Sequence, residues 1–351
     1  MEQYGPILPG SGESAGFRGF RNSPGRGQQQ RAPAPRRSRI LKPLTTPYNR
    51  TLHSFAIFTA SATFLLIAAG ALVTSNSAGL SVPDWPTSFG SLYRMPPMVG
   101  GVKFEHGHRM FAEFIGLLTI ALALWTTRAD RRPWMRKLGW AALATVIVQG
   151  ILGGVTVLNG LPPAISTAHA AVGQAFFCIA VAISLFTGQR WSGEEPRTQV
   201  DLRRPPLTTL AWVTVAAIYV QLILGGMFRH HGMRLLPHLI WAAVVTLLTL
   251  WTTLRVLSRH GQVEPLRRPA FILAHLLAIQ LGLGFLAYLT RVVWNPNTAH
   301  PTALMVGATV AHVSVGALLL ATAVVLAIQV TRYVPVVSDE TVEGTEGAVP
   351  A

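Results

Sequence analysis

Residues 105–125 read EHGHRMFAEFIGLLTIALALW, a cluster of ionisable side chains followed directly by a long apolar run. The cluster contributes a carboxylate, two imidazoles and a guanidinium, from Glu105, His106, His108 and Arg109. The apolar run has about the ~20 residues that a helix needs to cross a bilayer. Ionisable groups at the edge of such a helix are costly in lipid and usually face the interior of a helix bundle. The stretch therefore predicts a membrane helix whose first turns carry a polar site.

Seven more apolar runs of similar length occur along the chain. All eight together cover residues 53–75, 107–127, 138–158, 164–187, 207–228, 235–255, 269–290 and 303–330. The composition agrees with a membrane location, because 50% of the 351 residues are hydrophobic and 12% are charged, whereas soluble domains carry roughly 25% charged residues. We therefore expect an all-α integral membrane protein with eight transmembrane helices.

The net charge of +15 follows the topology rather than a nucleic-acid site. The basic residues fall in short clusters between apolar runs, such as 128–137 and 255–268, and no nucleic-acid motif accompanies them. These clusters alternate with segments that hold few basic residues, which the positive-inside rule assigns to the outer side. Both termini are then cytoplasmic (or on the matrix side), residues 76–104 face outward, and the expected partner is a lipid bilayer, not nucleic acid.

Four histidines recur in alternate predicted helices. They are His108, His169, His238 and His312, and the orientation above places all of them in the outer half of the membrane. A motif, Q-x-x-L-G, also recurs at 149–153, 221–225 and 280–284, where its glycines would allow close helix approach. Both patterns indicate two copies of one four-helix unit.

The repeat predicts two tandem four-helix bundles. The N-terminal bundle covers residues 53–190 and the C-terminal bundle covers 205–332. Residues 1–52, rich in Gly, Pro, Gln and Arg, are expected to form a disordered basic cytoplasmic tail without a signal peptide. Residues 333–351 are expected to form a polar cytoplasmic tail. The single cysteine, Cys178, excludes a disulfide or a cysteine-ligated metal centre within one chain.

Each bundle offers two histidines from facing helices. Helix bundles commonly build cofactor sites in this way, and imidazole is a standard axial ligand of haem iron. The alternatives are a histidine that only hydrogen-bonds a neighbouring helix, which we favour for His275, and zinc, for which carboxylate or cysteine ligands are scarce. We expect one haem at His108 and His169 and another at His238 and His312.

A carboxylate distinguishes the first bundle from the second. Glu105 lies about one helical turn before His108, whereas the corresponding position before His238 is Leu235. This asymmetry indicates chemistry in the first bundle and a permanent cofactor in the second. The alternative is that Glu105 only complements the helix dipole.

Three other side chains have open roles. Arg109 and Arg229 are candidates for binding haem propionates, or they are cations at the membrane surface. Trp85 is an interfacial anchor or covers a porphyrin edge. Glu113 is a proton relay or a polar contact to a neighbouring helix.

Together these residues resemble the haem A synthase family. The resemblance rests on the loop GALVTSNSAGLSVPDWP at 70–86, on E-x-x-H-R at 105–109, on QGILGG at 149–154, and on the single histidines 169, 238 and 312. It implies oxidation of the C8 methyl of haem O to a formyl group, giving haem A for terminal oxidases. It further implies that His238 and His312 hold haem b, that His108 and His169 bind the substrate haem, and that Glu105 is the catalytic acid.

The resemblance also implies partners and a location. Haem O synthase, terminal oxidase assembly factors and an unidentified electron donor are the expected partners, and self-association is left open. The expected location is the bacterial cytoplasmic (inner) membrane, with the mitochondrial inner membrane as the alternative. Many bacterial members carry a cysteine pair in the first outer loop, and this chain has none there.

Three other activities compete with this hypothesis. A bis-histidine dihaem b-type electron carrier without a substrate would use the same four histidines but gives no reason for Glu105. A haem transporter would be expected to show broken helices or a polar pathway at mid-membrane. A haem O-forming prenyltransferase would need clustered aspartates for magnesium, and the aspartates here are isolated.

Overall fold

The computed structural model describes residues 47–92, 94–193, 198, 201–296, 298 and 300–335. Within these ranges it contains α1 (Arg50–Ser75), α2 (Val102–Ala129), α3 (Pro133–Leu158), α4 (Pro163–Thr187), α5 (Leu207–Arg229), α6 (Leu236–Arg259), α7 (Glu264–Tyr288) and α8 (Ala303–Tyr333). All eight are long and apolar enough to cross a membrane. The prediction of eight transmembrane helices is confirmed.

The helix ends follow local sequence signals. Asn49 caps α1 by accepting a hydrogen bond from the N–H of Leu52 at 3.0 Å, and Thr302 caps α8 in the same way through Met305 at 3.2 Å. Proline occupies one of the first positions of α3, α4, α6 and α7, where its missing N–H costs nothing. α2 begins at Val102, before the predicted apolar run at 107–127. Its first turn contains the polar residues Lys103 and Glu105, which an apolar pattern does not include.

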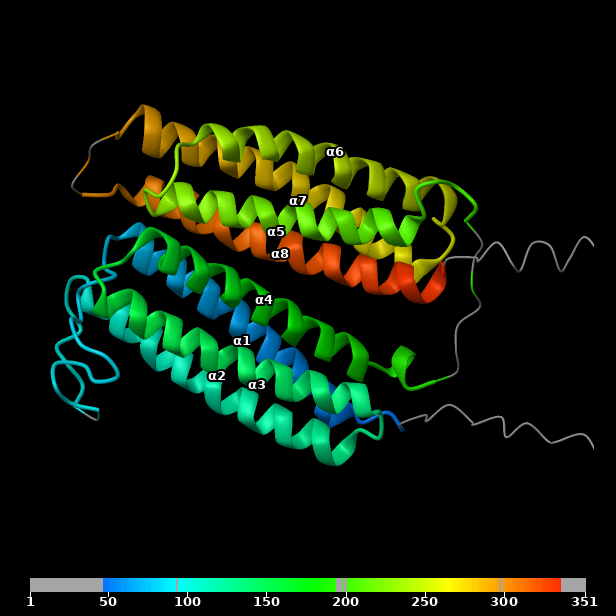
Figure 1. Ribbon diagram of the computed structural model, residues 1–351, viewed down its shortest axis with the longest axis horizontal. Coiled ribbons are helices and arrows are strands. Elements are labelled where there is room, and N and C mark those ends of the chain that lie inside the picture. Colours follow the sequence, from blue (N-terminus) through cyan, green and yellow to red (C-terminus); the bar gives the residue numbers. More distant parts are fainter. Residues whose placement is uncertain are drawn as a thin grey trace, which may run out of the picture. The chain divides into compact units, whose positions relative to one another are not determined.

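The helices form two groups of four that follow one another along the chain (Figure 1). α8 packs against α1 and α4, and α4 also packs against α5, so the groups share one compact unit. Each group has its own apolar core, and a third cluster of Phe177, Ala317 and Ala321 joins α4 to α8. Most of the two predicted tails, residues 1–46 and 336–351, lies outside the described residues.

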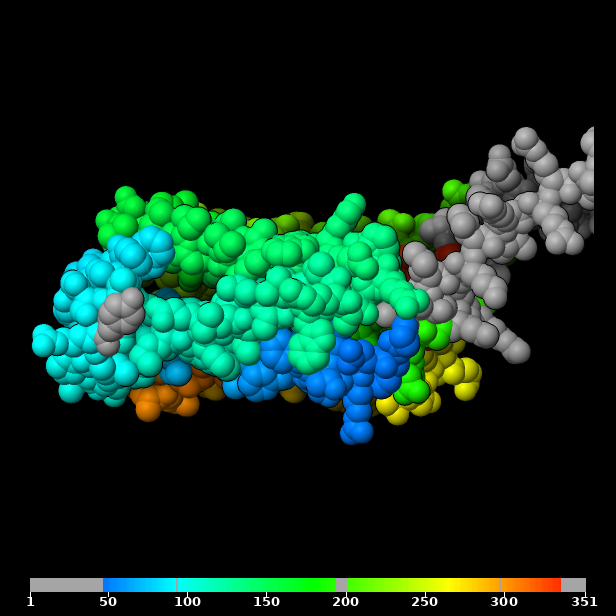
Figure 2. All heavy atoms as spheres, turned by 90° about the horizontal axis from the view of Figure 1, so that it is seen from below, coloured from blue at the N-terminus to red at the C-terminus, as the bar shows by residue number. Residues whose placement is uncertain are grey.

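The loop between α1 and α2 has a fixed local structure. Asp84 accepts hydrogen bonds from the N–H groups of Phe89 at 2.7 Å and Gly90 at 2.8 Å, and from the Thr87 hydroxyl. The hydrogen bond from Thr87, followed by that from Gly90, lowers the pKa of Asp84 to about 2. This loop forms the cyan surface at one end of the helices in Figure 2.

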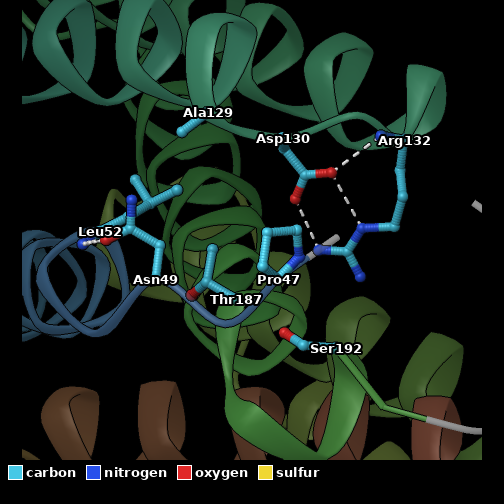
Figure 3. Close-up of a pocket in the computed structure, with 8 residues that line it drawn as sticks. All are labelled: Pro47, Asn49, Leu52, Ala129, Asp130, Arg132, Thr187 and Ser192. Carbon is cyan, nitrogen blue, oxygen red and sulfur yellow. Dashed lines mark hydrogen bonds and ion pairs between the residues drawn. The ribbon is translucent and has the colours of Figure 1, made fainter. Parts of the chain in front are cut away.

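Two buried ion pairs fasten the opposite ends of the helices. Arg132 binds Asp130 at 2.6 Å (Figure 3). It also donates to the carbonyl oxygen of Phe186 at 2.9 Å, which ties the turn after α2 to the end of α4. Arg255 in α6 binds Asp201 in the same manner at 2.9 Å. Both pairs lie on the side that the basic clusters assign to the cytoplasm, far along the helices from the four histidines.

Candidate functional site

Each of the four histidines packs against a glycine of the preceding helix. A Cβ atom added to Gly70 would lie 3.1 Å from Cε1 of His108, and one added to Gly153, Gly225 or Gly284 would lie 3.0 Å from Cε1 of His169, His238 or His312 respectively. Any larger residue would push the ring away, so glycine is required for this close contact. Four neighbouring helix pairs therefore hold an imidazole in the same way.

A glutamine accompanies three of these glycines. Nε2 of Gln149, Gln221 and Gln280 lies 3.4 Å from Nε2 of His169, His238 and His312 respectively. Each glutamine precedes its glycine by four residues, about one helical turn. The glutamine and the glycine therefore lie on the same face of their helix, and both face the histidine of the next helix. Donation from the amide requires an unprotonated Nε2, the form of imidazole that binds a metal. The repeated motif is therefore a histidine-binding motif, a role beyond the close helix approach expected from sequence.

His108 is held differently. The residue four positions before Gly70 is Leu66, which has no hydrogen-bonding group, and Nδ1 of His108 is buried without a hydrogen-bond partner. His169, by contrast, has its Nδ1 3.2 Å from the carbonyl oxygen of Gln149. His108 and His169 lie within electrostatic range of each other.

The second pair fits a ligand held between two imidazoles. The ring centroids of His238 and His312 are 6.5 Å apart, with the ring planes at 77°. Two imidazoles that bind one ion from opposite sides through bonds of about 2.0–2.1 Å have centroids roughly 6–7 Å apart. The Nδ1 atoms of both rings are buried without partners. Within the described ranges no group of three or more His, Cys, Asp or Glu residues could hold a metal ion, so the site residues come as histidine pairs.

Glu105 and Arg109 connect α2 to the loop between α1 and α2, residues 76–101, which we call the outer loop after its predicted side of the membrane. Glu105 is 4% exposed, and its two carboxylate oxygens accept hydrogen bonds from the N–H of Val82 at 2.8 Å and from Arg109 at 2.6 Å. Arg109 also donates to the carbonyl oxygens of Asp84 at 2.6 Å, Val82 at 2.9 Å and Thr87 at 3.1 Å. These contacts fix the loop one helical turn from His108. The contacts of Arg109 are therefore to protein groups.

Trp85 in the same loop lies against α3. A Cβ atom added to Gly154 would lie 2.4 Å from Cδ2 of the indole. Gly154 directly follows Gly153, the residue of α3 that contacts His169. The Trp85 indole and the His169 ring therefore contact neighbouring residues of α3. The relative exposure of Trp85, 38%, leaves one part of the indole free. Both roles considered for Trp85 remain compatible with this position.

The other predicted residues lie at the surface or at the bundle junction. Arg229 donates to the carbonyl oxygen of Thr74 in α1 at 2.6 Å. Glu113 is exposed on α2. His275 is also exposed, and its Nδ1 lies 2.8 Å from the carbonyl oxygen of Phe271, so it bonds within its own helix rather than to a neighbouring one. His106 lies 3.0 Å from the Ser88 hydroxyl in the loop.

The fold and the site define a class: a multi-pass helical membrane protein with paired histidines in two successive four-helix groups. A family model described as "Cytochrome oxidase assembly protein" matches residues 102–237. A protein named "Heme A synthase" from Symbiobacterium thermophilum is 27% identical over 278 residues, which cover 69% of this chain and 89% of that protein. The chain is therefore similar to proteins of the haem A synthase family.

Two further relatives with the same name cover less of each chain. The protein from Exiguobacterium sibiricum is 28% identical over 187 residues, 52% of this chain and 61% of the relative. The protein from Shouchella clausii is 27% identical over 189 residues, 52% of this chain and 60% of the relative. All three relatives are bacterial.

Proposed function

We propose that this chain is a haem A synthase that oxidises the C8 methyl of haem O to a formyl group and so supplies haem A for terminal oxidase assembly. The observation that carries the proposal is an asymmetry between two similar histidine pairs. Both pairs rest on glycines, but only the first has a buried carboxylate, Glu105, one turn away. The names of the relatives support the same activity.

Haem b is the resident cofactor in this proposal, held by His238 and His312. Their ring separation of 6.5 Å supports the binding of one iron between the two rings. Gln221 and Gln280 lie against these rings, and binding of iron through Nε2 would replace their 3.4 Å contacts. His108 and His169 would bind the substrate haem, whose iron supplies the redox chemistry when it is bound.

Glu105 is the proposed catalytic carboxylate. Its carboxylate is buried and held by Val82 and Arg109, so it has a fixed position near His108. A fixed carboxylate in a water-poor site stabilises developing positive charge or accepts a proton. The corresponding Leu235 offers neither function to the second pair.

The outer loop would complete the first site. Arg109 holds the loop carbonyls of Val82, Asp84 and Thr87, and Trp85 packs on Gly154 beside the contact of His169. We propose that the loop excludes water from the substrate. Arg109 and Arg229 remain proposed contacts for haem propionates, although Arg109 would have to exchange a protein partner to make one.

The proposed setting is the bacterial cytoplasmic membrane with both termini in the cytoplasm. The four histidines and the outer loop would then lie near the outer surface. Haem O synthase, terminal oxidase assembly factors and an electron donor are proposed partners.

The test is haem extraction and chromatography from a host that makes haem O but lacks its own haem A synthase. The wild-type chain is expected to yield haem A or its hydroxylated precursor, and Glu105→Gln is expected to lose it while retaining haem b. Glu113→Gln is the matched control, because Glu113 is a carboxylate on the same helix but exposed. Two haems b per chain with no modified porphyrin would instead favour the alternative, a dihaem electron carrier.

A further inference from the structure

Two half-buried arginines lie at the outer ends of the C-terminal helices. Arg229 ends α5, and Arg291 lies in η2, the π-helical turn Leu289–Val293 that follows α7. The ion pairs of the described residues involve other arginines, namely Arg109, Arg132, Arg190, Arg255 and Arg268. Arg229 and Arg291 lie within electrostatic range of each other, so two like charges are partly desolvated together. Such a pair is costly unless an anion compensates it.

Arg229 reaches the N-terminal helices. Its Nη2 donates to the carbonyl oxygen of Thr74 at 2.6 Å. Thr74 lies one helical turn beyond Gly70, the glycine that contacts His108. One turn before Arg229, Gly226 packs on Thr167, where an added Cβ would lie 3.0 Å from the methyl group. Thr167 precedes His169 by two residues. The end of α5 therefore contacts α4, which carries His169, and α1, whose Gly70 packs against His108.

His230 follows Arg229 directly and is partly buried. Burial, followed by the neighbouring Arg229, His231 and His169, lowers the pKa of His230 to about 4. His230 is therefore neutral at physiological pH and adds no charge to the arginine pair. The π-helical turn that carries Arg291 is of a kind often found at functional sites.

We propose that Arg229 and Arg291 form a carboxylate-binding site that serves the porphyrin held by His108 and His169. The inference rests on the proposed function for the identity of that ligand. Porphyrins such as haem O carry two propionates, and arginine binds carboxylates through two parallel hydrogen bonds. The repeat predicts one self-contained site per bundle, whereas this arrangement completes the N-terminal site with C-terminal residues.

The test is a binding titration on the purified full-length chain with its resident porphyrin. Haem O and its dimethyl ester are added separately, and binding is followed by the Soret absorption. Wild type is expected to bind haem O at least tenfold more tightly than the ester. Arg229→Gln and Arg291→Gln are each expected to reduce this preference several-fold. Arg234→Gln, an exposed arginine nearby, is expected to leave it unchanged.

Arg229→Lys separates binding from folding, because it keeps the charge and a donor for Thr74. It is expected to melt at the wild-type temperature and to keep part of the preference. Equal binding of haem O and its ester by wild type would overturn the proposal. So would an Arg229→Gln chain that loses the resident porphyrin but binds added haem O normally, since the arginines would then serve the second pair.

A lipid phosphate is the other anion that could compensate the pair. The titration is therefore repeated in nanodiscs with and without phosphatidylglycerol. If wild type binds haem O and its ester equally, and phosphatidylglycerol raises the melting temperature of wild type but not of Arg229→Gln, the phosphate is the occupant and the carboxylate assignment is wrong. If the ester preference is intact but no haem A forms in the host, the proposed function fails and this inference stands.

Discussion

The imidazole rings of His238 and His312 lie with their centroids 6.5 Å apart, each resting on a glycine of the preceding helix. The same contact recurs at His108 and His169, so four helix pairs use one local arrangement. The arrangement depends on a missing side chain, which makes the glycines direct targets for testing it.

Gly284→Ala is expected to weaken retention of the porphyrin at the second pair. The new Cβ would lie 3.0 Å from Cε1 of His312, closer than an ordinary contact, and the ring would have to move. We expect at least a several-fold faster loss of haem b, measured by the pyridine haemochrome assay on the purified protein. Gly282→Ala is the control, because nothing lies within 4 Å of a Cβ at that position. Equal haem retention by the two variants would contradict the assigned contact.

Gly154→Ala is expected to displace the outer loop. The added Cβ would lie 2.4 Å from Cδ2 of Trp85, so the indole or the helix must shift. Overpacking of this kind costs about 1–3 kcal/mol. The expected result is faster proteolysis of the loop and lower haem A production, compared with Gly150→Ala, which has nothing within 4 Å. A proteolysis rate equal to that of the control would place Trp85 elsewhere.

Arg109→Gln is expected to be more harmful alone than together with Glu105→Gln. The single change leaves the 4% exposed Glu105 carboxylate without its arginine, and removal of one partner of a buried pair costs about 3–5 kcal/mol. Thermal unfolding of both single variants and the double variant measures the coupling. Strictly additive effects would mean that the pair contributes no interaction energy. Activity is expected to stay low in the double variant because it lacks Glu105.

The outer loop is expected to stay folded from neutral pH down to about pH 4. The hydrogen bonds from Thr87 and Gly90 lower the pKa of Asp84 from 3.8 to about 2, so its charged form is the stabilised one. A lowered carboxyl pKa contributes stability above the unfolded value of about 3.9 and loses it as the pH falls toward the folded value. Proteolysis of the loop between pH 7 and pH 2.5 measures this. In the Asp84→Asn variant we expect the protease to cleave the loop faster already at pH 7, and we expect the cleavage rate to change little with pH.

The transmembrane helices were predictable because a bilayer imposes a length and a composition that each run satisfies by itself. The sequence predicted two histidine pairs because the repeat places the four histidines at one depth. The sequence did not predict that Gln149 and Gly153 hold His169, because this role depends on which residues of α4 face α3. A glutamine followed four residues later by glycine, beside a helix with one histidine, is the signal that could have revealed it.

The partners of Arg109 were hidden for a different reason. They are backbone carbonyls of Val82, Asp84 and Thr87, and a carbonyl has no signature in the sequence. The contact of Arg229 with Thr74 joins helices from different halves of the repeat. Internal similarity predicts how each half is built but gives no information on how the halves meet.

The packing of α8 against both α1 and α4 has a consequence for biosynthesis. α8 leaves the ribosome after the other seven described helices, yet it packs against α1, the earliest of them to be made. Until α8 is inserted, the faces of α1 and α4 that it covers remain open to lipid. The first four helices can therefore be inserted early but reach their final packing only after α8 has joined them.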